Sequence, residues 1–125
     1  MDIHHDINKT IESLNFLIDE VFEKAHIEDE IELDNCFIQF NLFYTENEYF
    51  TSLINFNKKA KDNFIKTAII NIKIVYDTLK VMDKLAMEDK DKLHAFAFMS
   101  LVLCKANLYL YKRLEEGTWA VSPIT

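Results

Sequence analysis

Glycine and proline are nearly absent from this chain of 125 residues, which contains one of each, Gly117 and Pro123. Average composition would supply about nine glycines and about six prolines. The loops that cradle phosphate groups in P-loop and dinucleotide-binding proteins need several glycines, so neither kind of nucleotide site is present. Tight two-residue hairpins also depend on glycine. The shortage therefore argues against a many-stranded sandwich or barrel.

Cysteines are few, and targeting signals are not visible. The two thiols, Cys36 and Cys104, lie far apart among apolar neighbours and form no Cys-x-x-Cys pair. Buried thiols in a reducing compartment are the simplest interpretation, so we expect a cytoplasmic protein. Residues 1–6 lack the basic and apolar stretches of a secretory signal. The longest nearly continuous apolar run, residues 95–104, is shorter than the about 20 residues of a bilayer span, so no membrane partner is expected.

Apolar residues are abundant, and their spacing is helical. Half of the chain is hydrophobic, which suits one folded domain over residues 1–117 with a tail at 118–125. Within residues 3–26, apolar side chains recur in steps of three and four, and polar side chains occupy the opposite face. This pattern predicts an amphipathic helix. The same periodicity predicts helices over residues 63–87 and from the polar break at 88–90 to about residue 116.

The last of these helices is apolar nearly all round. Leu93 and Leu101 lie on one side, while Phe98, Val102 and Leu110 lie elsewhere around it. A helix of this kind is surrounded by protein. Either another segment of the chain covers its back, or another subunit does. We therefore expect a homo-oligomer, in which the residues assigned to self-association are Ile70, Ile74, Phe98 and Val102.

Residues 36–56 fit two different structures. Apolar side chains alternate from Cys36 to Tyr44, as in a strand, and residues 45–48 could close a hairpin. The same residues also form a helical stripe, and two strands without a partner sheet are marginal in water. We therefore favour helix, with a break near residues 45–48. The sequence predicts an all-α, compact bundle of about four helices, and the minor alternative is an α+β fold with a hairpin at about residues 36–56.

Charge is divided unevenly along the chain. Residues 1–50 hold thirteen acidic and two basic side chains, whereas residues 51–125 hold eight acidic and twelve basic ones. An acidic half can attract a basic surface on another protein and speed association. We therefore expect a protein partner with a basic surface, which binds at eight of the carboxylates within the first 34 residues. The members of this set are Glu12, Asp19, Glu23, Glu28, Asp29, Glu30, Glu32 and Asp34.

Lysines recur every seven residues, in a stripe along the predicted helix of residues 63–87 and just before it. The members are Lys59, Lys66, Lys73 and Lys80. The stripe is either a solvated face or the partner of an acidic stripe on the first helix, in which case the pairing selects which helices are neighbours. Exposed pairs contribute only about 0.2–1 kcal/mol each. Because no arginine or aromatic residue is interleaved with the lysines, nucleic acid is not an expected partner.

Two sequence pairs have the spacing found in dimetal sites of helical bundles, Glu23-x-x-His26 and Asp91-x-x-His94. The first pair lies on the polar side of its helix. Asp91 fits the first turn of its helix as a partner of the helix dipole, and His94 fits a hydrogen-bonded position at the edge of the core. We therefore expect no metal and no cofactor. A metal-dependent enzyme that uses these four residues is the alternative function.

Groups for nucleophilic catalysis are not arranged together. Ser13, Ser52 and Ser100 have no recognisable partner motif, and the helical rise separates Cys104 from His94 by about 15 Å. No catalytic residue is assigned, and an enzyme is not the favoured function. The sequence predicts a non-enzymatic protein-binding module that self-associates, such as a small acidic inhibitor, an immunity-type protein or an adaptor.

Overall fold

The structure is a computed structural model and describes residues 2–81 and 85–115. These residues form helices joined by short connections. The elements are α1 (Ile3–Phe16), the π-helical segment η1 (Leu17–Phe22), α2 (Glu30–Glu46), α3 (Glu48–Ala60), α4 (Asn63–Val81) and α5 (Met87–Glu115). The all-α prediction is confirmed. The hairpin alternative at residues 36–56 is wrong, because α2 and α3 occupy that stretch. The predicted tail at 118–125 lies outside the described residues.

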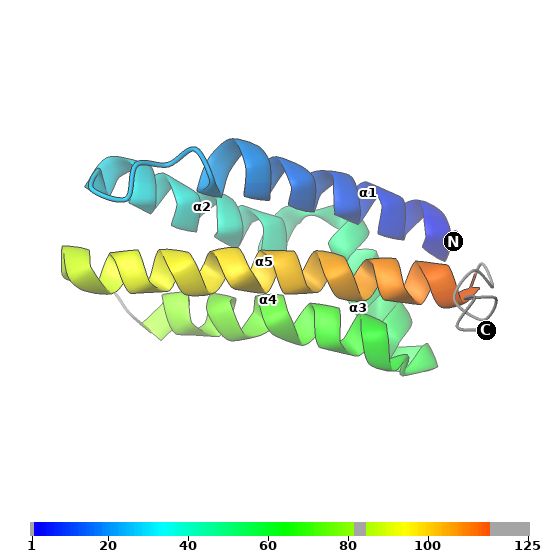
Figure 1. Cartoon of the computed structure of the whole chain (residues 1–125). Helices are drawn as coiled ribbons and strands as arrows, with labels where there is room; N and C mark the ends of the chain where they lie inside the picture. Colours follow the sequence, from blue (N-terminus) through cyan, green and yellow to red (C-terminus); the bar gives the residue numbers. More distant parts are fainter. Residues whose placement is uncertain (1, 82–84, 116–125) are drawn as a thin grey trace, which may run out of the picture.

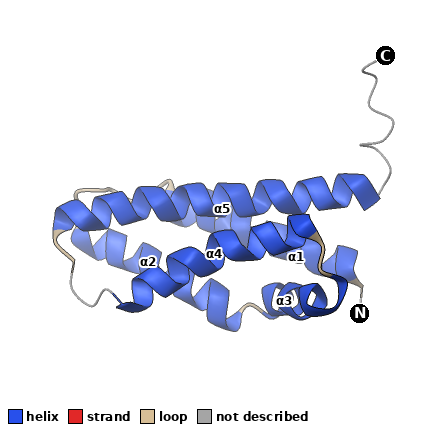
Figure 2. Cartoon of the chain, turned by 90° about the horizontal axis from the view of Figure 1, so that it is seen from below, coloured by secondary structure: helices blue, strands red, loops and turns tan. Residues whose placement is uncertain are grey.

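Four of the helices lie lengthwise beside one another. Figure 1 shows that α1 and α4 run in one direction while α2 and α5 run in the other. The short α3 crosses behind α5, from the end of α2 to the start of α4, and Figure 2 places it at the end of the bundle where α1 begins. Counting α3, the described residues form five α-helices, one more than the sequence predicts.

The core lies between the four long helices and is built from the apolar stripes that the sequence shows. Every element contributes at least one side chain that is nearly or completely buried. The largest of these are Phe22, Phe40, Phe50, Ile7, Leu14, Leu33, Leu53, Ile65, Ile72, Leu101 and Leu108. Truncating such a side chain to alanine costs about 2–5 kcal/mol, because the lost burial adds to the cost of the cavity.

The first predicted helix, residues 3–26, changes its winding and ends earlier than expected. The last turns, Leu17–Phe22, are π-helical, and the Glu23 N–H donates to the Ile18 carbonyl at 2.9 Å. A π-turn accommodates one extra residue and so shifts the phase of the helix. Leu17, Ile18 and Phe22 are consequently all buried. Phe16, just before the change, points outward and is 57% exposed.

Asn47 separates α2 from α3. Its backbone is extended, with φ −74° and ψ 111°, and its Oδ1 accepts hydrogen bonds from the Tyr49 and Phe50 N–H groups at 3.1 and 3.0 Å. Asn47 therefore caps α3. Its Nδ2 donates to Ser13 Oγ of α1 at 3.0 Å. The break predicted near residues 45–48 is confirmed, and this one side chain both caps α3 and ties the corner to α1.

The two roles of Asn47 can be separated by mutation. Asn47→Asp keeps the oxygen that caps α3 and loses the donor to Ser13, whereas Asn47→Ala loses both. We expect Asn47→Ala to be less stable than Asn47→Asp by about 1 kcal/mol, the usual contribution of an N-cap. Urea unfolding followed by circular dichroism measures the difference. Equal stabilities of the two variants would show that the cap contributes nothing.

His94 lies inside the bundle, where it links α5 to the end of η1. It is buried, its Nε2 lies 3.0 Å from the Phe22 carbonyl oxygen, and its ring stacks on the Phe22 ring with a centroid distance of 5.1 Å. The imidazole thus supplies the hydrogen bond that a buried carbonyl at a helix end needs. This position explains a polar residue on the core side of α5.

Replacing His94 by leucine should destabilise the fold although the volume is nearly kept. The Phe22 carbonyl would remain buried without a donor, which costs about 1–3 kcal/mol. Chemical denaturation should show this loss for His94→Leu and no comparable loss for His26→Leu, because His26 is exposed. A His94→Leu protein of unchanged stability would mean that the hydrogen bond to Phe22 is dispensable.

The connection before α5 differs from the expected one. The helix predicted over residues 63–87 ends at Val81, and α5 begins at Met87, so the break comes earlier than 88–90. Glu88 and Asp89 lie in the first turn of α5, where carboxylates favour the helix dipole. Between α3 and α4, Lys61 adopts the left-handed conformation with φ 53°, a position that glycine usually fills.

Candidate protein-binding site between α1 and α2

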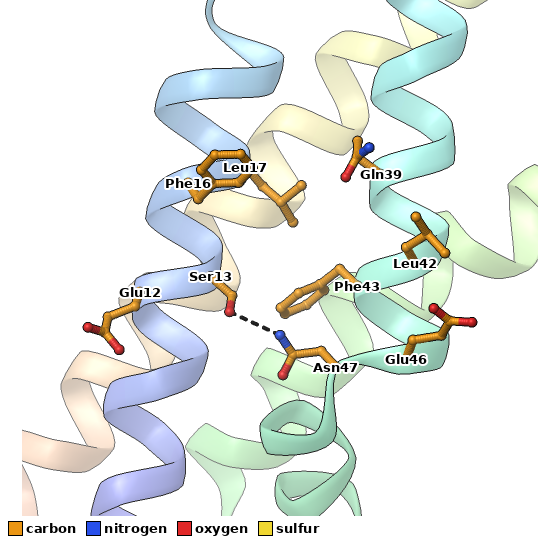
Figure 3. Close-up of a pocket in the computed structure, with 9 residues that line it drawn as sticks. All are labelled: Glu12, Ser13, Phe16, Leu17, Gln39, Leu42, Phe43, Glu46 and Asn47. Atoms are coloured by element: carbon orange, nitrogen blue, oxygen red, sulfur yellow. Dashed lines mark hydrogen bonds between the residues drawn. The ribbon is translucent and has the colours of Figure 1, made fainter.

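A cleft of about 470 Å³ opens between α1 with η1 on one side and α2 on the other. Figure 3 shows Leu17 and Phe43 pointing into the space between the helices, with Phe16 at its upper edge. The residues that line the cleft are Glu12, Ser13, Phe16, Leu17, Gln39, Leu42, Phe43, Glu46 and Asn47. The floor is therefore apolar. Ser13 and Asn47, joined by their hydrogen bond, close one end.

Exposed apolar side chains continue from the cleft along α2. Ile31 and Ile38 are 81% and 56% exposed, and Leu42 follows on the same side of the helix. A second cleft of about 370 Å³ contains Ile31, Val21 and Ala25. We call Phe16, Ile31, Ile38 and Leu42, together with the two clefts, the α1–α2 face. A patch of contiguous exposed apolar residues with a polar border is typical of a protein-interaction site.

Carboxylates border this face on both sides. Figure 3 shows Glu12 on the outer flank of α1 and Glu46 on the outer side of α2. Glu12 pairs only with Lys9 of its own helix, at 3.2 Å, and both side chains are exposed. Within the described residues, Asp19, Glu23 and Glu46 have no ion-pair partner. The cleft of about 470 Å³ is lined by Glu12 and Glu46 and by no lysine or arginine of the part that the structure describes, so the charge beside its apolar floor is negative and favours a positively charged ligand.

The eight carboxylates predicted to bind a partner fall into two groups. Glu12, Asp19, Glu23 and Glu28 are exposed, and Glu12 pairs only with Lys9 of its own helix. The other four have structural partners. The Asp29 carboxylate caps α2 by accepting from the Ile31 and Glu32 N–H groups, Glu32 pairs with His26 at 3.0 Å, and Lys90 bonds Glu30 and Asp34. Residues 28–34 therefore include the capped start of α2.

Lys90 carries the main electrostatic link between the acidic and basic parts of the chain. Its ammonium lies 2.8 Å from both Glu30 and Asp34 of α2, and its side chain is 12% exposed. The hydrogen bonds that the Lys90 ammonium donates to Asp34 and Glu30 raise the pKa of Lys90. The proposed pairing between the lysine stripe and the acidic stripe is wrong. Lys73 pairs with Asp77 of its own helix, and Lys80 lies over the Tyr76 ring.

The four residues of the metal alternative are not brought together. Glu23 and His26 are exposed near the end of η1, and His26 Nδ1 bonds Glu32. His94 is buried against Phe22, where its Nε2 is already engaged. No group of three or more His, Cys, Asp or Glu side chains within residues 2–81 and 85–115 has the arrangement to hold a metal ion. The observed geometry gives Glu23, His26, Asp91 and His94 no shared site.

The residues predicted for self-association occupy the outer sides of α4 and α5, with one exception. Ile70, Ile74 and Val102 are exposed. Phe98 is half-buried, packs against the main core, and lies 6.4 Å from the His94 ring. Its side chain therefore contributes to the fold, and a substitution there would disturb the core as well as any contact with another copy.

Both thiols are buried, as the sequence predicts. Burial raises the pKa of Cys36 to about 11 and raises the pKa of Cys104 still further from its ordinary value. The Cys36 thiol also donates to the Val21 carbonyl at 3.7 Å. Because the thiolate is the reactive form, neither cysteine is prepared for nucleophilic chemistry. Ser13 likewise uses its hydroxyl structurally, by donating to the Lys9 carbonyl.

The raised thiol pKa values make stability depend on pH. The ordinary pKa of a cysteine thiol is 9.0. Above that pH, an unfolded cysteine loses its proton while the folded one keeps it. The free energy of unfolding therefore falls as pH rises. Each cysteine contributes a slope of about 1.4 kcal/mol per pH unit. Urea unfolding between about pH 9 and pH 10 should therefore show a shallower slope for Cys36→Ser than for the native protein. Identical slopes would contradict the burial of Cys36.

Comparisons of the chain with protein-family models, with curated proteins and with solved structures found no match. The function is therefore inferred from the geometry of the site.

Sequence reasoning missed the apolar part of the α1–α2 face. Phe16 is an apolar residue on the polar side of the first helix, and that mismatch was a signal that it is exposed. Ile31 and Ile38 lie seven residues apart, and Leu42 follows Ile38 by four residues. This spacing marks a second apolar stripe on α2, which the ambiguity between helix and strand concealed.

Proposed function

We propose that this protein is a non-enzymatic protein-binding module, and that its α1–α2 face binds a basic, amphipathic helix of a partner protein. The observation that carries the proposal is the pairing of an exposed apolar floor with carboxylates on both flanks, Glu12 on α1 and Glu46 on α2. Apolar grooves commonly bind amphipathic helices. A small acidic inhibitor, an immunity-type protein or an adaptor would work in this way.

The dimensions of the face fit such a ligand. The two clefts adjoin α2 from Ile31 to Asn47, a distance of about 24 Å at the helical rise of 1.5 Å per residue. A helix of about 15 residues would cover it. Apolar side chains of this helix would meet Phe16, Ile38 and Leu42, and its lysines or arginines would meet the flanking carboxylates. Charge attraction of this kind raises the association rate and is weakened by salt.

Binding of a helical Leu/Lys peptide of about 15 residues tests the proposal. We expect the labelled peptide to bind with an affinity that falls as salt rises, and a Leu/Glu peptide of the same pattern not to bind. Glu12→Lys combined with Glu46→Lys should weaken binding about tenfold or more, because two attractions become repulsions. Fluorescence anisotropy measures the affinities. The matched control, Glu88→Lys with Asp89→Lys, changes the net charge equally on exposed residues of α5 and should have little effect.

A second pair of variants tests the apolar floor. Leu42→Ser should weaken the Leu/Lys peptide severalfold, whereas Val81→Ser, at an even more exposed position on α4, should not. Equal effects at the two positions would show that the peptide adheres to the acidic protein without using this face, which would reject the proposed site.

A further inference from the structure

The outward side of α5 is an apolar stripe. Between residues 95 and 110 the only charged residue is Lys105, which is half-buried. The large exposed side chains in this stretch are Phe96, Met99, Val102, Leu103 and Tyr109. Because they recur mainly at intervals of three and four residues, they share one side of the helix over about 20 Å. This side is opposite the buried one, which includes Ala97, Leu101, Cys104 and Leu108.

The neighbouring helix widens this stripe. Thr78 of α4 and Phe96 of α5 line one cleft of about 330 Å³, so the outer sides of the two helices adjoin. Figure 2 shows α4 and α5 side by side. Ile74 and Ile70, both exposed, lie about one and two turns before Thr78 on α4. We call Ile70, Ile74, Phe96, Met99, Val102 and Leu103 the α4–α5 face.

Charges at the two ends of α5 are opposite in sign. The first turn carries Glu88 and Asp89, and the last turn carries Lys112 and Arg113. Glu88 and Arg113 lie equally far, about 12 residues, before and after the point midway between Met99 and Val102. A two-fold axis through the middle of the stripe would therefore bring the acidic end of one α5 near the basic end of another. A parallel arrangement would bring like charges together, which is unfavourable.

We propose that the α4–α5 face binds a second copy of this chain, with the two α5 helices packed antiparallel about an axis that passes between Met99 and Val102. This contact is separate from the α1–α2 face. It explains why a helix of a small protein has apolar side chains on both of its sides: one side packs in the core of its own chain, and the other packs across the dimer.

A lipid bilayer is the competing occupant. By length and composition, α5 is the one helix among the described residues that could span a membrane. The same helix buries His94 and Ser100 in the bundle, and a spanning orientation would require that packing to be lost. Dimer formation leaves the bundle intact, so the second copy is the occupant that the observed packing favours.

Light scattering of the full chain tests the dimer. The native protein should have about twice the mass of one 14.8 kDa chain. Met99→Lys should give monomers, because two lysines would be buried at the axis. The control Ile38→Lys makes the same chemical change at an equally exposed residue of the α1–α2 face and should stay dimeric. Circular dichroism establishes that both variants fold. A native protein that is monomeric at all concentrations would overturn the inference.

Cross-linking through new cysteines tests the antiparallel orientation. Val102→Cys should form a disulfide between copies rapidly, because the axis passes beside it. Phe96→Cys should not, because four to five residues on either side of the axis separate the two sulfurs by about 13 Å. Native Cys36 and Cys104 are fully buried and should not react. Equal cross-linking of both variants would mean a parallel dimer and would reject this arrangement.

A charge exchange tests the contact between the ends of α5. Glu88→Lys and Arg113→Glu, both at exposed positions, should each raise the dissociation constant about threefold or more, and the two changes in one chain should restore it. A purely structural role of either residue would not be rescued in this way.

Flotation with vesicles of anionic phospholipid completes the test. Binding of native protein that Met99→Lys abolishes would assign the face to lipid. Leu/Lys peptide binding by a monomer would leave the proposed function standing while this inference fails.

Discussion

Burial of one side of α5 is the interaction on which the whole structure depends. The 29-residue helix packs its buried side against α1, η1, α2 and α4, and only α3 lies outside that main set of contacts. Leu101, Cys104 and Leu108 are fully buried there. Because α1, η1, α2 and α4 all meet this common partner, a loss of its packing would weaken the contacts of all four. The bundle is therefore organised around α5.

The pattern of apolar residues predicts the fold class because the helical stripes are long. It does not predict the details that depend on single side chains. The change of winding at η1 leaves no mark in the sequence, since Leu17, Ile18 and Phe22 fit either kind of helix. The corner at Asn47 is visible as a cap, whereas its bond to Ser13 joins residues 34 positions apart, and only tertiary structure brings them together. The sequence also does not show which side of α2 is buried, because both of its sides carry isoleucine, leucine or phenylalanine.

Charge patterning predicts less than apolar patterning because the sequence does not show which charges remain in solvent. A lysine stripe with a repeat of seven residues looks like the electrostatic partner of the acidic half, yet those lysines stay near their own helix. The ammonium that links the halves is Lys90, which has no place in the repeat. Half of the carboxylates predicted for a partner are engaged within the chain. Of the carboxylates that remain exposed, Glu12 lines the cleft of the α1–α2 face, where Glu46 joins it, so the candidate site is defined by the two properties together.

The two proposed surfaces use different helices, and this separation has a functional consequence. A dimer through α4 and α5 leaves α1 and α2 of each copy uncovered and gives the assembly two identical acidic grooves related by the two-fold axis. A partner that presents two basic helices, or that is itself dimeric, could engage both grooves. The second contact would then be intramolecular, so overall affinity could exceed that of one groove without any new interaction. A weak affinity of a single α1–α2 face for a single helix is consequently compatible with firm binding by the dimer, and the apolar side of α5 would serve the function by setting the spacing between the two grooves.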